Sequence, residues 1–332
     1  MASIKQMIER RDNIASIVSY VRSRGKATRM EISSALSLSW ACVSDLTACM
    51  ISEGILCELS KSNSAAPETK GRIPTYLALC ENKYFLGVDI NDTGFAITVL
   101  SLSGKRLCSR KWAPERLETT DELIGSVCRK IEEMMSGNGE CLGIGVAMEG
   151  RHSEDGSWGY PLACGVVQMR PEIDIERYFG LPVLTRHDPE CMLYAAAESL
   201  DVDCMVVRVD TGIGVAAMKK GRILELPLEL GFIKTGDTTL RRILKASAKE
   251  GDHTVIAREL GLAAANLAWL LGVKKVYLVG KIIEWLADVR EEFDKAFRSV
   301  DERTEYEIST ISDASEGAAK VAMAEYPVIR EV

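Results

Sequence analysis

A strand that ends in a tight polar turn is the segment of this sequence best suited to holding an anion. The apolar run Leu86–Val88 leads into Asp89, and a turn containing Asn91, Asp92 and Gly94 follows. Backbone N–H groups in such a turn can point together at a phosphate. Here Asn91 and Asp92 stand where a phosphate cradle needs glycine, and Asp92 adds a negative charge. We therefore expect this loop to bind phosphate poorly.

A second strand and turn repeat this arrangement further along the chain. The strand-like run Met205–Val209 leads into Asp210, and Thr211, Gly212 and Gly214 form the turn before the next strand. Its glycines allow close approach of the backbone, so the turn is geometrically capable of holding an anion. Asp210, however, places a carboxylate beside it. The two similar beginnings predict two related lobes.

The elements that position these turns alternate between strands and helices over the last 245 or so residues. This alternation is typical of layered α/β folds. The predicted strands are Phe85–Val88, Ala96–Leu102, Leu142–Val146, Val183–Thr185, Met205–Val209, Val215–Met218 and Val276–Val279, and the main predicted helices are Thr120–Met135, Pro189–Leu200 and Thr254–Leu271.

The first 80 residues have a different pattern, which predicts a winged helix-turn-helix. A helical apolar stripe covers residues 13–24. Thr28 and Glu31 form a capping-box pattern for a short helix, and Ser39 can cap a longer helix that Gly54 ends. Two strands, over residues 55–59 and 75–79, form the predicted wing.

Charge is distributed in a way that fits a local DNA contact. The chain of 332 residues has a net charge of −7, with 41 basic and 48 acidic residues. Residues 1–80 hold ten Lys and Arg against seven Asp and Glu, which leaves 31 against 41 for the remainder. A mildly basic head on an acidic body is expected to contact DNA only through the head.

Cysteine usage predicts a reducing compartment. The ten cysteines are scattered singly, without a C-x-x-C pair, which excludes the usual structural zinc spacings. We recognise neither a signal peptide nor an apolar stretch long enough to span a bilayer. The expected location is the cytoplasm, with no membrane partner.

Several motifs together resemble the ROK family, which comprises bacterial sugar-responsive repressors, open reading frames and sugar kinases. The resemblance covers about residues 13–326. It rests on the segments Leu38–Ser44, Gly71–Pro74, Gly87–Asp89 with Thr93, Gly143–Val146, His187–Glu190, Thr211–Gly214 and Glu229–Phe232. It implies a winged helix-turn-helix domain at residues 1–80 and two actin/hexokinase-like (ribonuclease H-like) α/β lobes. The lobes are expected at residues 81–188 and 189–332, with residues 312–326 returning to the first lobe.

Departures from the family pattern predict that catalysis has been lost. Phe232 replaces the family's histidine, a zinc and sugar ligand, and no cysteine-rich zinc loop follows it. Gly280 is followed by Lys281 where the family has a glycine pair on the adenosine side. Phosphoryl transfer depends on positioned phosphates and a metal. With both phosphate loops impaired as well, we expect no enzymatic activity, no cofactor and no metal.

Four polar residues are candidates for binding an effector: His187, Asp188, Glu190 and Glu229. The resemblance places Asp188 at the family's catalytic base, which would deprotonate a sugar hydroxyl. Asp188 is equally suited to capping the helix that begins at Pro189, or to binding hydroxyls without catalysis. His187 and Glu229 have ordinary structural alternatives, as a hydrogen-bonding histidine and a solvated carboxylate.

The predicted recognition helix and wing supply the candidate DNA contacts. Side chains at the start of a recognition helix reach base edges and phosphates, and arginines suit the minor groove. The candidates are Arg29, Ser39, Trp40, Ser44, Thr47, Lys70 and Arg72.

The sequence thus predicts a DNA-binding transcriptional regulator whose body dimerises and binds a sugar or sugar phosphate. Two other functions stay open at this point. One is an ATP-dependent sugar kinase with an accessory DNA-binding head, and the other is a dimerisation scaffold that binds no ligand.

Overall fold

The computed structural model describes residues 4–59, 74–91, 94–150, 153, 156–162, 165–197, 202–224 and 229–325. Three of the candidate residues, Lys70, Arg72 and Thr93, lie outside these ranges.

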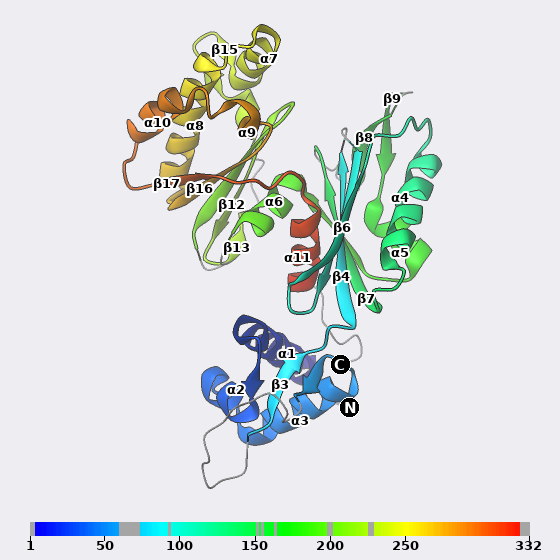
Figure 1. The fold of residues 1–332 in the computed structure, drawn as a ribbon. Coiled ribbons are helices and arrows are strands. Elements are labelled where there is room, and N and C mark those ends of the chain that lie inside the picture. Colours follow the sequence, from blue (N-terminus) through cyan, green and yellow to red (C-terminus); the bar gives the residue numbers. More distant parts are fainter. Residues whose placement is uncertain are drawn as a thin grey trace.

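The N-terminal head contains three helices and a small antiparallel sheet of order β1-β3-β2 (Figure 1). Its elements are α1 Ile4–Arg24, β1 Ala27–Thr28, α2 Arg29–Leu36, α3 Trp40–Ser52, β2 Leu56–Glu58 and β3 Tyr76–Leu79. The predicted capping box of Thr28 and Glu31 is present, and the Ser39 hydroxyl accepts the Cys42 N–H at 3.2 Å. Helix α1 begins at Ile4, earlier than the predicted residue 13, and its additional first turns are largely exposed.

The first sheet of the body has five strands in the order β10-β7-β4-β5-β6. These are β4 Lys83–Asn91, β5 Gly94–Ser101, β6 Arg106–Trp112, β7 Glu140–Met148 and β10 Val183–His187. Strand β5 runs antiparallel to its neighbours β4 and β6, whereas β7 and β10 are parallel to β4. Helices α4 (Thr120–Met135) and α5 (Pro171–Phe179) cover one face, and β8 (Trp158–Leu162) and β9 (Gly165–Met169) form a separate hairpin.

The second sheet repeats this topology in the order β13-β12-β11-β16-β17. Three antiparallel strands are again followed by two parallel ones, which confirms the prediction of two related lobes. The strands are β11 Cys204–Val209, β12 Ile213–Lys219, β13 Arg222–Ile223, β16 Lys275–Gly280 and β17 Glu305–Ile308. Around them lie η2 Leu230–Phe232, β14 Lys234–Thr235, β15 Thr238–Thr239, α7 Leu240–Glu250, α8 Thr254–Leu271, α9 Ile282–Trp285 and α10 Arg290–Arg298.

Helix α8 is the one helix of the described residues that is long and apolar enough to cross a membrane. Its buried side, however, packs into the core of the second sheet, together with Phe293 and Phe297 of α10. This packing accounts for its apolar character.

Two helices form a middle layer between the two sheets (Figure 1). They are α6 (Asp188–Ala196) and α11 (Ser315–Glu325). Glycines allow α11 to pack closely against the first sheet. A Cβ on Gly87 of β4 would lie 1.9 Å from the Ser315 carbonyl oxygen, and a Cβ on Gly145 of β7 would lie 1.9 Å from the Ala318 carbonyl oxygen. In α11 itself, a Cβ on Gly317 would lie 1.6 Å from the Cys191 carbonyl oxygen of α6. Gly87 and Gly145, two glycines of the resemblance motifs, therefore serve packing.

Candidate functional site

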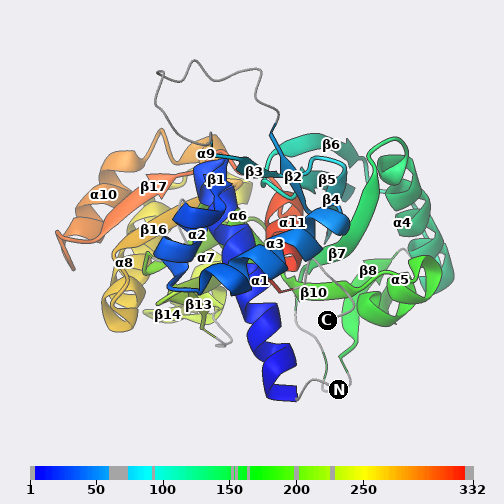
Figure 2. The same cartoon turned by 90° about the horizontal axis from the view of Figure 1, so that it is seen from below.

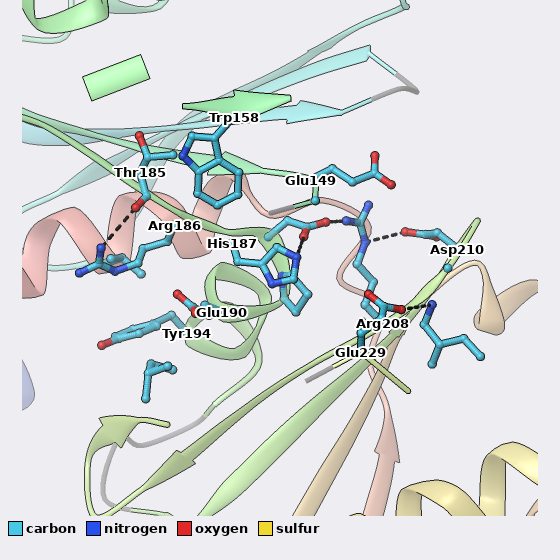
Figure 3. A pocket seen from close by; sticks show the side chains of 18 of the residues that line it. Glu149, Trp158, Thr185, Arg186, His187, Glu190, Tyr194, Arg208, Asp210 and Glu229 are labelled. Atoms are coloured by element: carbon cyan, nitrogen blue, oxygen red, sulfur yellow. Dashed lines mark hydrogen bonds and ion pairs between the residues drawn. The ribbon is translucent and has the colours of Figure 1, made fainter. Parts of the chain in front are cut away.

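A cleft of about 1000 Å³ opens where the two lobes meet (Figure 3). The ends of β7, β10 and β11 contribute to it, together with the start of α6, the turn before β12 and the last turn of α11. Four predicted effector residues, His187, Asp188, Glu190 and Glu229, line this cleft. The predicted turn residues Thr211, Gly212 and Gly214 line it as well.

An arginine that the sequence interpretation missed occupies the centre of the cleft. Arg208 of β11 forms an ion pair with the buried Asp188, and its Nε donates to Asp210 Oδ2 at 2.6 Å. His187 lies on the other side of Asp188, with Nε2 3.3 Å from Oδ1 (Figure 3). The carboxylate that the resemblance assigned to the catalytic-base position is therefore paired with a guanidinium of the chain itself. The predicted side-chain capping by Asp188 is wrong, because α6 begins at Asp188 itself and His187 is its N-cap residue.

The second turn directs a backbone N–H at a carboxylate of the chain itself. The Ile213 N–H donates to Glu229 Oε1 at 3.3 Å, and an antiparallel bridge joins Gly214 to Glu229. A Cβ on Gly212 would lie 3.7 Å from the same carboxylate oxygen. Glu229 thus stands where an anion bound by this turn would stand.

Asp210 makes the same kind of contact to the next turn. The Lys281 N–H, at the end of β16, donates to Asp210 Oδ1 at 2.9 Å. This is the turn that the resemblance assigned to the adenosine side. The Lys281 N–H on that side of the cleft therefore already has a hydrogen-bond acceptor, the Asp210 carboxylate.

Asp89 lies behind the cleft rather than in it. Its buried carboxylate accepts the Ala314 N–H at 2.9 Å and the Asn91 amide at 3.1 Å. Burial raises the pKa of Asp89, while the charge of Arg208 and the Ala314 N–H oppose that rise. Asp89 therefore anchors the segment that leads into α11.

The rest of the cleft combines aromatic surface with polar groups. Trp158 and Tyr194 line one side, and Phe232 of η2, 61% exposed, lines another. Arg186 contributes a half-exposed guanidinium from β10 (Figure 3). Aromatic faces flanked by carboxylates and guanidinium groups suit a small ligand that carries several hydroxyls.

The candidate DNA contacts in the head have different environments. Ser39 is exposed and caps α3, Ser44 is half-buried, and Trp40 is 57% exposed. The prediction that Thr47 lies on the exposed face is wrong, because its side chain is buried and donates to the Val43 carbonyl at 2.7 Å.

Arg29 is engaged within the head itself. Its Nε donates to the Thr47 hydroxyl at 3.0 Å, and it pairs with Glu58 of β2 at 3.0 Å. These contacts join α2 to α3 and the sheet. Met30, next to Arg29 on α2, is 72% exposed and was not among the predicted surface contacts.

Metal-binding geometry is absent from the described part of the chain. No group of three or more histidine, cysteine, aspartate or glutamate side chains converges there. All nine described cysteines are free thiols. Burial raises the pKa of the fully buried Cys191, which disfavours a reactive thiolate.

Comparison with known proteins shows which proteins this chain resembles. No protein-family model matches the chain. Among curated proteins, it is 23% identical over 227 residues to the DNA-binding transcriptional dual regulator NagC of Escherichia coli K12 and to the N-acetylglucosamine repressor of Shigella flexneri. The match covers 64% of this chain and 53% of each relative, about half of their length.

A solved ROK-family transcriptional regulator, described as a homologue of the E. coli MLC protein, superposes with a TM-score of 0.75 at 16% identity. The superposition covers 95% of this chain and 96% of that one. The chain has the ROK fold. The ROK hexokinase of Thermus thermophilus matches with a TM-score of 0.60 at 18% identity, over 71% of this chain and 96% of the hexokinase. The regulator thus matches nearly the whole chain, and the ROK kinase matches a smaller share of it.

Proposed function

We propose that this protein is a transcriptional regulator with a winged helix-turn-helix head at residues 1–80 and a ligand-binding body that has no kinase activity. The body comprises lobes at residues 81–188 and 189–332, with α11 returning to the first lobe. One observation supports this function above the others: the cleft's candidate base and backbone donors are bound by the protein's own side chains.

The contacts of the cleft argue against phosphoryl transfer. A kinase needs backbone donors open to phosphate and a carboxylate open to the substrate hydroxyl. Here Glu229 and Asp210 accept backbone N–H groups of two turns, and Arg208 binds Asp188. An incoming phosphate would have to displace carboxylates of like charge.

A coupled ADP-release assay tests this part of the proposal. We expect no release above background with ATP and Mg²⁺ across hexoses and amino sugars, including glucose and N-acetylglucosamine. Sustained sugar-dependent release that Asp188→Asn abolishes would instead establish the sugar kinase with an accessory head.

The proposed effector is a sugar or sugar phosphate bound between the lobes. Glu190 and Glu229 would accept hydrogen bonds from its hydroxyls, and the His187 imidazole would donate or accept one. The aromatic side chains would cover its ring. Binding would close the lobes and change the placement of two heads in a dimer. A thermal-shift screen of sugars distinguishes this from a scaffold that binds no ligand, because binding to the native state raises the melting temperature.

The proposed DNA-contacting surface is the exposed start of α3, with Ser39, Trp40 and Ser44, and the segment that contains Lys70 and Arg72. The free thiols and the similarity to NagC support action in the cytoplasm.

Trp40→Ala is expected to weaken binding to a specific duplex by about tenfold, because a side chain that contacts a base in the specific site is worth about 1–3 kcal/mol. Electrophoretic mobility shift with increasing protein would measure this change. Trp269→Ala is the matched control, since Trp269 of α8 is 58% exposed and lies on the body. Equal affinities of the two variants would remove Trp40 from the DNA surface.

A further inference from the structure

The last turn of α11 lies between the cleft and the head (Figures 1 and 2). Val321 and Glu325 line the cleft, and Glu325 lies 4.0 Å from the guanidinium of Arg186. Ala322 and Met323, on the intervening positions, pack into the hydrophobic cluster of the head. The last turn of α11 therefore contacts both the cleft and the head.

The head is seated on the body through side chains of α1. Arg11 donates to the Glu325 carbonyl oxygen at 3.4 Å, and Arg22 donates to the Leu102 carbonyl oxygen at 2.8 Å. Phe85, Leu102 and Leu142 of the first lobe belong to the same hydrophobic cluster as the apolar face of α1. The head therefore contacts the body through hydrogen bonds and apolar packing, in addition to the covalent connection of the chain.

The opposite end of α11 is fixed to the first lobe. Asp89 accepts the Ala314 N–H, and the Ser315 hydroxyl lies 2.7 Å from that of Thr98. Close backbone packing against Gly87 and Gly145 holds the first part of the helix, Ser315–Ala319. Because only the start of α11 is anchored in this way, a ligand that engages Arg186 or Glu325 would move the last turn. The contacts of that turn with Arg11 of α1 and with the hydrophobic cluster of the head would move with it.

We propose that the last turn of α11, Val321–Glu325, transmits occupancy of the cleft to the DNA-binding head. This inference rests on the proposed function. It assigns the coupling to direct contacts between α11 and α1, rather than to lobe motion transmitted through the chain connection alone.

Charge reversal in the cleft provides a probe that needs no identified effector. Arg186→Glu places two carboxylates where an ion pair stands, and their repulsion would displace the end of α11. Arg186 is part of the body, so its substitution does not alter the proposed DNA-contacting surface. The readout is the Kd for a duplex enriched by the wild-type protein from a random-sequence library.

The decoupling variant is Arg11→Ala with Met323→Ala, which removes the Arg11 hydrogen bond to the Glu325 carbonyl and the Met323 side chain that packs against the hydrophobic cluster of the head. Its matched control is Arg10→Ala with Met7→Ala. Arg10 pairs with Asp45 inside the head, and Met7 is 43% exposed on α1. Arg11→Ala alone serves as a milder second decoupling variant, and melting curves confirm that each protein is folded.

We expect Arg186→Glu to change the Kd by at least about fivefold in the wild-type and control backgrounds, and by less than about twofold in the decoupled background. An equal change in all backgrounds would overturn the inference, as would no change in the wild-type background. If no duplex is enriched, the proposed function itself fails, and the inference falls with it.

Discussion

Gly317→Ala is expected to leave the body without a stable fold. The added Cβ would lie 1.6 Å from the Cys191 carbonyl oxygen, which belongs to the backbone of α6 and cannot rotate away. The two helices of the middle layer would have to separate, and both contact the sheets. We expect a loss of more than about 3 kcal/mol in the free energy of unfolding, the upper range for overpacked cores.

Gly125→Ala is the control for this substitution, because Gly125 also lies within a helix, α4. A Cβ there meets only the end of the flexible Arg129 side chain, at 3.6 Å. Alanine should stabilise that helix by about 0.5–1 kcal/mol. Urea unfolding followed by circular dichroism measures both variants, and a Gly317→Ala protein as stable as the wild type would refute the packing of the middle layer described here.

Arg208→Met is expected to destabilise the protein by about 3–5 kcal/mol, because it leaves a buried charge without its partner. Asp188 is 2% exposed and depends on Arg208 for its ion pair, with His187 beside it. Removing the guanidinium also leaves Asp210 without the Arg208 Nε donor. The same urea titration gives the change in free energy.

The double variant Arg208→Met with Asp188→Asn distinguishes an ion-pair effect from loss of packing. Neutralising the buried carboxylate should recover more than half of the lost stability, since replacing a whole buried pair costs much less than breaking it. No recovery in the double variant would show that Arg208 contributes by packing and that the bridge described here is secondary.

Local chemistry made much of the head predictable. The capping box at Thr28 and the Ser39 cap are encoded by adjacent residues, so both helix starts were found correctly. The first turns of α1 were missed although Ile4, Met7 and Ile8 have helical spacing, because the charged run Glu9–Asp12 separates them from the stripe that begins at Ile14. Thr47 was placed on the wrong side because its polar type gave no sign of the internal bonds to Val43 and Arg29.

The cleft could be predicted only in part. The strand ends and turns followed from sequence pattern, and the repeat at Asp89 and Asp210 correctly predicted two lobes of matching topology. The decisive contacts join residues distant in sequence: Arg208 binds Asp188, and Glu229 binds the turn at Ile213. A single arginine in an otherwise apolar strand, Cys204–Val209, was the available signal that it faces a buried acid.

The measurement that most directly tests the central claim is selection of DNA duplexes from a random-sequence library by the wild-type protein at low salt, followed by mobility shift with the enriched duplex. The account predicts enrichment of a defined sequence, a shift that competitor DNA of unrelated sequence does not abolish, and weaker binding by Trp40→Ala but not by Trp269→Ala. Absence of enrichment, with no shift of any duplex at low salt, would contradict it.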